Sequence, residues 1–169
     1  AYEVNVESLS TNAELVWCHI ISGSESILCG CIYRPPQATH ETNTEIIKAI
    51  GKAKHLRNMN KFSSVIIVGD FNHSDIDWFD YGGICKNKGR PSSLNMLECL
   101  NSNSLSQLVT KPTFESRVLD LIITDDPTRY FHIDHGPPLG CSKNNRLHCS
   151  LSWDLLLKTH KDDTKTISQ

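Results

Sequence analysis

Apolar residues in the first third of the chain follow the pattern of a β-hairpin. Residues 14–21 (ELVWCHII) and 27–33 (ILCGCIY) are apolar runs, separated by the Ser- and Gly-rich residues 22–26. Pro35 and Pro36 end the second run, because proline has no amide hydrogen to give to a strand ladder. We therefore expect an antiparallel pair of strands.

Two stretches show helical spacing. Thr42 and Glu45 have capping-box spacing at the start of the first. Its apolar positions recur with helical period: Ile46, Ile50, Ala53 and Leu56. Its basic positions are expected on a solvated face: Lys48, Lys52, Lys54 and Arg57. Pro91 opens the second helix, for which we expect an inward face of Leu94, Leu97 and Leu100.

Residues 63–69 (SSVIIVG) form an unbroken apolar run, short and rich in β-branched residues, which predicts a strand buried on both faces. A polar loop is expected from residue 70 to about 90. Further strands are predicted at 105–109, 118–124 and 148–157. The polar residues 158–169 are expected to form a linker or a disordered tail. Mixed strands and helices around a buried strand predict an α/β layered domain over residues 1–157.

Composition excludes several classes of protein. The chain has 169 residues, 17 Lys and Arg against 19 Asp and Glu, and no stretch near the roughly 20 apolar residues of a membrane helix. Its net charge of -2 is not that of a general polyanion binder, so any nucleic-acid contact needs a local patch. Seven cysteines include no C-x-x-C pair; Cys29 and Cys31 should share a strand face as buried thiols, which favours a reducing, intracellular location in nucleus or cytoplasm.

The segment VGDFN (68–72) places two polar side chains directly after the buried strand. In extended backbone Asp70 and Asn72 point to the same side, so both can face one cleft at the strand end. A carboxylate can orient or deprotonate water, and an amide N–H can bind a phosphoryl oxygen. A simple turn is the alternative interpretation.

Two further sets of residues could carry chemistry. Asp120 interrupts the apolar strand VLDLIIT (118–124), where a carboxylate is costly unless it is paired; it could hold a histidine, or lie on an edge strand in water. HIDH (132–135) is interpreted as a surface turn, since it lacks zinc-site spacing. Basic residues are in local excess between residues 81 and 111: Lys86, Lys88, Arg90 and Lys111. They could contact a nucleic-acid backbone or simply lie in a solvated loop.

Five segments in order resemble one family. IYRPP (32–36), VGDFN (68–72), DIDW (75–78), LDLIITD (119–125) and PLG (138–140) are similar to the endonuclease/exonuclease/phosphatase family, and specifically to the endonuclease domain of LINE-type, non-LTR retrotransposon polyproteins. The resemblance implies a four-layer, DNase I-like α/β sandwich, here N-terminally truncated.

The resemblance also implies Mg²⁺- or Mn²⁺-dependent hydrolysis of a DNA phosphodiester, and a reverse transcriptase fused downstream. Asp70 would activate water and offer a metal ligand, and Asn72 would bind phosphate. Tyr33 and Arg34 would lie on the substrate side, and Asp120 would hold the catalytic histidine, for which His148 is the candidate.

Two departures from the family pattern suggest impaired activity. The early asparagine and the metal-binding glutamate of the family would lie upstream of residue 14. The closing Ser-Asp-His motif corresponds either to Ser142, Lys143 and Asn144, or to the sequence around His148 with Leu147 in place of the aspartate. The alternatives are a decayed, non-catalytic binding module, or a phosphatase of the same fold.

Overall fold

The computed structural model describes residues 2–3, 9, 11–86, 90–138 and 147–158. Within them, the main sheet has the strand order β1-β2-β3-β4-β8-β7, and β5–β6 and β9–β10 form two smaller antiparallel pairs. The strands are β1 (Tyr2–Glu3), β2 (Leu15–Ser22), β3 (Glu25–Tyr33), β4 (Ser64–Asp70), β5 (Ile76–Phe79), β6 (Gly82–Cys85), β7 (Ser106–Gln107), β8 (Asp120–Thr124), β9 (Tyr130–Gly136) and β10 (Ser150–Leu155). The helices are α1 (His40–Asn58), α2 (Pro91–Ser102) and the short 3-10 helix η2 (Pro127–Arg129).

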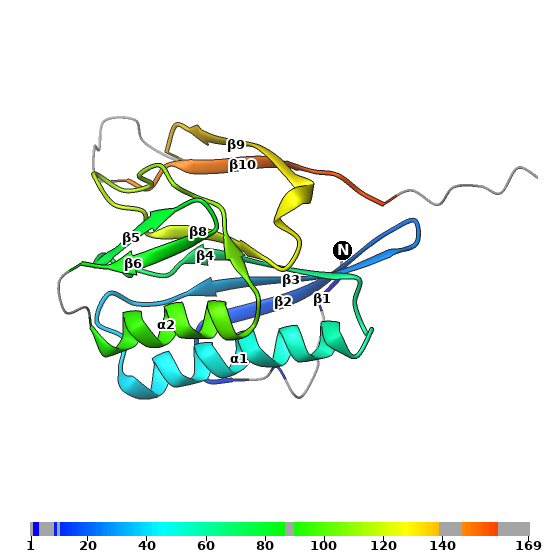
Figure 1. Ribbon diagram of the computed structural model, residues 1–169, viewed down its shortest axis with the longest axis horizontal. Coiled ribbons are helices and arrows are strands. Elements are labelled where there is room, and N and C mark those ends of the chain that lie inside the picture. Colours follow the sequence, from blue (N-terminus) through cyan, green and yellow to red (C-terminus); the bar gives the residue numbers. More distant parts are fainter. Residues whose placement is uncertain (1, 4–8, 10, 87–89, 139–146, 159–169) are drawn as a thin grey trace, which may run out of the picture.

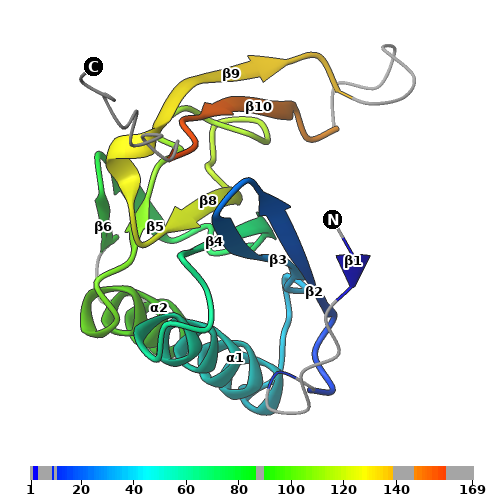
Figure 2. The same ribbon diagram turned by 90° about the vertical axis from the view of Figure 1, so that its right-hand side faces the viewer.

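The layers follow from alternation along the central strands. Val65 and Ile67 of β4 pack with the helices, whereas Ile66 packs with Ile122 and Tyr130 on the opposite face. Figures 1 and 2 show α1 and α2 covering one face of the main sheet and β9–β10 the other. The α/β sandwich is therefore confirmed, and the described part of the chain forms three of the four predicted layers.

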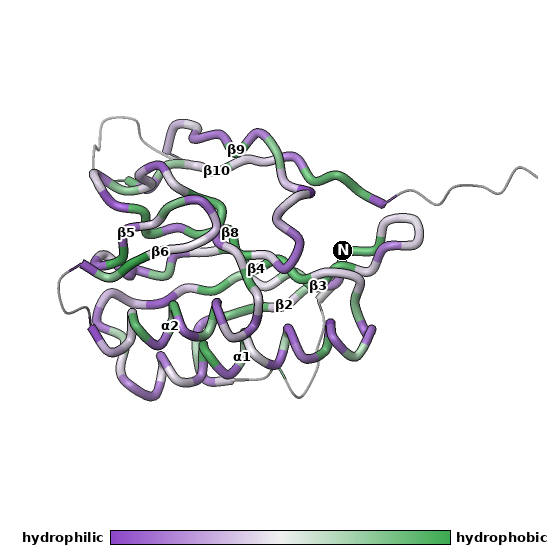
Figure 3. The backbone as a smooth tube through the Cα atoms, viewed as in Figure 1, coloured by the Kyte–Doolittle hydropathy of each residue, from purple (hydrophilic) through white to green (hydrophobic). Residues whose placement is uncertain are grey.

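Hydropathy along the backbone agrees with this layering (Figure 3). Hydrophobic residues follow the inner strands, such as β3 and β8, while much of β9 is hydrophilic. The hairpin β2–β3 and the buried strand β4 are confirmed, with β4 parallel to β3 and antiparallel to β8. Strand β8 lies between β4 and β7, although β7 pairs only with Ile123 and Thr124. The Asp120 side chain is 20% exposed and bonded to His148, so the interpretation that it lies in water is wrong.

Both helices are confirmed, with two corrections. Helix α1 begins three residues earlier than predicted, because the side chain of Thr39, not Thr42, accepts the capping hydrogen bond, from the Thr42 amide. In α2 Leu100 is buried and Leu97 packs against the core, as predicted, but Leu94 is exposed, and the helix turns Ser93 and Met96 inward. Helical spacing predicted the element and only part of the face that it buries.

Four other predictions are wrong in detail. The loop 70–90 contains the hairpin β5–β6, and HIDH lies within strand β9. The basic face of α1 is only partly solvated, because Lys54 and Arg57 form ion pairs with the buried Asp125. The thiol of Cys31 is exposed, although that of Cys29 packs against the core under β9–β10.

None of the described helices is long and apolar enough to cross a membrane. Lys158, expected to begin the polar tail, donates its amide to Glu25, and residues 159–169 lie outside the described part.

Candidate active site

Three polar side chains lie in one row across the main sheet. Strand pairing places Tyr33 of β3 opposite Asp70 of β4, and Asp70 opposite Asp120 of β8. All three follow the same alternation as Ile66 and Ile122, so they belong to the face covered by β9–β10. The row lies where β3 and β4 end, which is the sheet edge that the sequence predicted.

Glycine at position 69 has a steric reason. Gly69 has a φ of +139°, and a Cβ there would lie 1.9 Å from the carbonyl oxygen of Ile32. The close approach of β4 to β3 therefore excludes any side chain immediately before Asp70. It explains the first letter of the GDFN motif by packing rather than by chemistry.

Asn72 is held firmly in a conformation that few residues adopt. Its φ is +49°, its amide N–H donates to Asp70 Oδ1 at 3.0 Å, and its Nδ2 donates to the Arg34 carbonyl at 2.9 Å. The side-chain amide of Asn72 also donates toward the Asp70 carboxylate. Asn72 therefore lines the cleft next to Asp70, held to it by its backbone amide and its side chain.

His148 closes the constellation from the layer above. Its Nδ1 lies 2.7 Å from Asp120 Oδ2, and its Nε2 lies 3.9 Å from Asp70 Oδ2. A carboxylate bonded to one ring nitrogen fixes the ring and directs the other nitrogen. The predicted pairing of Asp120 with a histidine is thus present as geometry.

The turn before β8 supports this pair. Thr113 is buried, and its Oγ1 accepts from the amides of Leu119 at 3.0 Å and Asp120 at 3.1 Å. Its carbonyl accepts from the Cys149 amide at 2.9 Å. The ring of Phe114 packs on the imidazole of His148 with centroids 4.8 Å apart. Sequence reasoning missed both residues, because neither lies in a motif with chemical spacing.

These residues line a cleft of about 500 Å³. Its walls are formed by Tyr33, Pro36, Gln37, Asp70, Asn72, Ser74, Arg90, Phe114, Arg117, Leu119 and His148. Arg90 and Arg117 are the basic residues of this wall, and Arg117 was not singled out from the sequence. The cleft thus combines a carboxylate, an amide and an imidazole with two guanidinium groups.

The electrostatic setting favours Asp70 as a proton acceptor. Burial raises the pKa of Asp70 above its ordinary value, and the facing carboxylate of Asp120 raises it further. His148 and the hydrogen bonds from Asn72 act in the opposite direction without cancelling the rise. A carboxylate with a raised pKa binds a proton more readily, as a general base must.

Some predicted substrate residues lie elsewhere. Arg34 is 3% exposed, and its guanidinium donates to Asn43 Oδ1 at 2.7 Å and to the carbonyls of Phe71 and Asn72. Its contacts make it a support for the Asn72 loop, without a free face toward a substrate. Lys86 forms an exposed ion pair with Asp77 and does not line the cleft, and Lys88 lies outside the described residues.

The donor set can be tested for fit to a divalent metal. Ligand atoms of Asp70, Asp120 and His148 all lie within 4.8 Å of one another. Asp120 Oδ2 and His148 Nδ1 already bind each other, which leaves Asp70 and His148 Nε2 as the open donors. Mg²⁺ commonly uses one or two carboxylates completed by water and substrate phosphates, so the residues present fit such a site.

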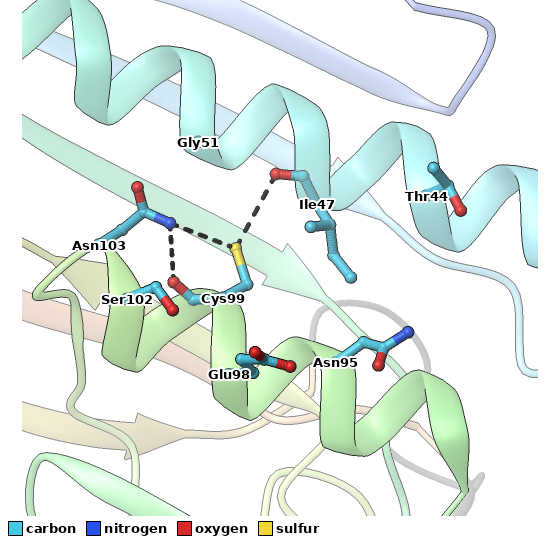
Figure 4. A pocket seen from close by; sticks show the side chains of 8 residues that line it. All are labelled: Thr44, Ile47, Gly51, Asn95, Glu98, Cys99, Ser102 and Asn103. Atoms are coloured by element: carbon cyan, nitrogen blue, oxygen red, sulfur yellow. Dashed lines mark hydrogen bonds between the residues drawn. The ribbon is translucent and has the colours of Figure 1, made fainter.

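A second hollow lies between α1 and α2 and has different chemistry (Figure 4). It measures about 450 Å³, and Cys99 at its floor contacts the Ile47 carbonyl and the Asn103 amide. Burial raises the pKa of Cys99 to about 11, so the thiol stays protonated, and Glu98 carries the charge of this lining. Because the Cys99 thiol is protonated and therefore not an activated nucleophile, the hollow does not form a catalytic site.

The layered fold with a carboxylate–amide–imidazole cleft at its sheet edge defines a hydrolase of the DNase I-like class. A family model described as "Endonuclease-reverse transcriptase" matches residues 27–146, and the chain belongs to this family. By family resemblance it is a hydrolase of the nuclease type.

A solved structure, the "Endonuclease domain of TRAS1, a telomere-specific non-LTR retrotransposon", shares the fold with a TM-score of 0.64. The match has 16% sequence identity and covers 94% of this chain and 70% of that one. No curated protein matches the sequence.

Proposed function

We propose that the chain is the endonuclease domain of a LINE-type, non-LTR retrotransposon, and that its substrate is a DNA phosphodiester. One observation carries the proposal: Asp70, Asn72 and the Asp120–His148 pair converge on the cleft that Arg90 and Arg117 line. Guanidinium groups near such a cleft suit phosphate oxygens. The family description supports a reverse transcriptase in the same polyprotein, and hence action inside the cell, in nucleus or cytoplasm.

Each side chain has a role that its contacts permit. Asp70, which lines the cleft at the end of β4, orients a water molecule and accepts its proton. Asn72, which lines the cleft beside Asp70, gives an amide hydrogen to a non-bridging phosphate oxygen as negative charge builds. Tyr33, with 43% of its surface exposed at the cleft, borders the phosphate position.

His148 acts on the same phosphate from the layer above. Asp120 holds the Nδ1 side of the ring, so Nε2 is the nitrogen that faces Asp70 and the cleft. From there it binds a phosphate oxygen or gives a proton to the leaving oxygen. When bound at Asp70, Mg²⁺ or Mn²⁺ supplies charge neutralisation on the phosphate.

The sequence next to His148 favours low activity. Leu147 occupies the position where the family's closing Ser-Asp-His motif has an aspartate. Loss of one member of a catalytic set typically lowers the rate by orders of magnitude, so slow nicking is expected. A non-catalytic DNA-binding module is therefore the second candidate, and a phosphatase of the same fold the third.

Plasmid nicking with Mg²⁺ or Mn²⁺ separates these candidates. We expect slow relaxation of supercoiled plasmid that EDTA abolishes, that Asp70→Ala abolishes, and that Leu147→Asp accelerates. Asp154→Ala is the matched control, because Asp154 lies on β10 away from the cleft lining. DNA binding without nicking in any variant would favour the binding module, and release of phosphate from inositol phosphates would favour the phosphatase.

A further inference from the structure

The segment 70–75 divides by alternation into two sides. Asp70, Asn72 and Ser74 line the cleft. Phe71 and His73 turn inward and are 0% and 4% exposed. The family chemistry explains the cleft side of this segment but leaves a buried histidine without a role. An inward polar group needs partners, so its contacts indicate what it does.

His73 belongs to a chain of hydrogen bonds that ends beside the cleft. Its Nδ1 lies 3.0 Å from Ser93 Oγ, and Ser93 Oγ donates to Asp75 Oδ1 at 2.7 Å. Asp75 Oδ2 then accepts from the Arg90 amide at 2.8 Å. Because Ser93 has one hydroxyl hydrogen and gives it to Asp75, it accepts from His73, which therefore carries its proton on Nδ1.

The chain of bonds links two elements that the cleft needs in fixed positions. Its first residue follows Asn72 directly, in the loop after β4. Its last acceptor holds the backbone of Arg90, which precedes α2 and lines the cleft. Ser93 sits between them and is 0% exposed. Arg34 secures the same loop from the other side through the carbonyls of Phe71 and Asn72.

We propose that His73, Ser93 and Asp75 are positioning residues, which fix Arg90 relative to the Asn72 loop so that its guanidinium meets a DNA phosphate. The inference deepens the proposed function and rests on it for the identity of the ligand. We call this chain of hydrogen bonds from His73 through Ser93 to Asp75 the relay. Asp75 begins the DIDW segment, so the relay also gives this segment a physical role. Burial and the nearby Arg34 lower the pKa of His73 to about 3, so the ring stays neutral and the relay keeps its direction at neutral pH.

The salt dependence of DNA binding distinguishes positioning from a merely structural role. The affinity of the full chain for a duplex oligonucleotide is measured in EDTA over a series of KCl concentrations. Each lost phosphate contact lowers the slope of log K against log salt by about 0.9 for duplex DNA. We expect this decrease for Arg90→Ala and, to a large part, for Ser93→Ala, with no further decrease in the double variant.

Matched variants control the experiment. Ser92→Ala removes a neighbouring hydroxyl outside the relay and should leave the slope unchanged. His73→Asn keeps a donor near the Nδ1 position and should restore most of the slope that His73→Leu loses. If Ser93→Ala does not fold, this histidine pair carries the test. Unchanged slopes with a lowered melting temperature would overturn the proposal, because the relay would then only stabilise the fold.

Failure of DNA binding can be told apart from failure of the relay. If the unmodified chain does not bind duplex DNA, the proposed function is wrong, and the relay is examined in the free protein by ¹⁵N NMR. A slowly exchanging His73 Nδ1 proton and a displaced Arg90 amide resonance in Ser93→Ala would support the positioning of Arg90. An unchanged Arg90 resonance would overturn it.

Discussion

Within the described residues, two histidines each lie at hydrogen-bond distance from an aspartate, with nearly the same geometry in different surroundings. His148 Nδ1 lies 2.7 Å from Asp120 Oδ2, and His132 Nδ1 lies 2.8 Å from Asp154 Oδ2. The side chains of the first pair are 36% and 20% exposed, and those of the second 79% and 73%. The separation of the two groups therefore does not distinguish a candidate catalytic pair from a surface pair.

The surroundings make the difference. Around the first pair, a second carboxylate, that of Asp70, lies 3.9 Å from His148 Nε2, and the ring of Phe114 packs on the imidazole. Thr113 Oγ1 accepts a hydrogen bond from the Asp120 amide. The second pair bridges β9 and β10 in solvent, next to an irregularity in their pairing. Water screens an exposed pair and weakens its attraction. A site is thus made by what holds and faces the pair, and this gives four tests.

The largest contrast is expected in DNA nicking. Asp120→Asn removes the carboxylate that fixes His148, and we expect a loss of roughly 10²–10⁴-fold in nicking rate, the range of general acid–base contributions. Asp154→Asn, the same change in the surface pair, should leave the rate unchanged. The two variants are compared in one plasmid relaxation series with Mg²⁺. Equal losses in both would contradict the assignment of the first pair.

Acid unfolding tests a third histidine, which has no carboxylate as a direct partner. His73 has a pKa of about 3 in the folded chain against 6.5 ordinarily, chiefly because burial disfavours its charged form. Between these values the unfolded chain binds the proton more readily. The contribution of His73 is therefore fully present above about pH 6.5 and is lost as pH falls toward 3, by roughly 1.4 kcal/mol per pH unit.

Urea unfolding at pH 7 and pH 5 measures this effect. The unmodified chain should lose more free energy of unfolding between the two pH values than His73→Asn, which has no titrating ring. Ser93→Ala, which keeps the buried imidazole, should retain the greater loss. Equal pH dependence in the unmodified chain and His73→Asn would show that this ring does not set the acid limit.

The support under the first pair should have an intermediate effect. Thr113→Val keeps the shape of the side chain but leaves the buried amides of Leu119 and Asp120 without their acceptor. We expect a loss of about 1–3 kcal/mol in the free energy of unfolding, together with slower nicking. Thr128→Val is the control, since the Thr128 hydroxyl binds Asp126 at the surface. Chemical denaturation of both variants checks the difference.

Much of the first pair could be predicted from the sequence, because its strands have distinctive patterns. The unbroken apolar run before Asp70 and the lone carboxylate in VLDLIIT indicated a buried strand end and a paired aspartate. The support could not be predicted in this way. Thr113 and Phe114 lie in an irregular turn, and their contacts with residues 119–120 and 148–149 depend on tertiary structure.

The secondary structure around the surface pair, and in two other segments, was predicted wrongly. HIDH holds one apolar residue, Ile133, so it was interpreted as a turn, although it pairs with β10 as part of β9. The hairpin β5–β6 was missed because each strand has four residues and β6 begins with two glycines. The inward face of α2 was misjudged at Leu94, which is exposed, because the prediction gave weight to Leu94 and none to Ser93, whose partners His73 and Asp75 lie outside the helix.

The smallest effect is expected from the surface pair itself. His132→Ala removes an imidazole that is 79% exposed and whose partner Asp154 is 73% exposed, so little desolvation and little screened attraction are lost. Exposed ion pairs typically contribute between 0 and about 1 kcal/mol, and we expect the melting temperature to stay within a few degrees. Differential scanning fluorimetry at low and high salt checks this. A large, salt-sensitive loss would mean that the β9–β10 layer depends on the pair, and that distance alone carries more of the energy than its surroundings.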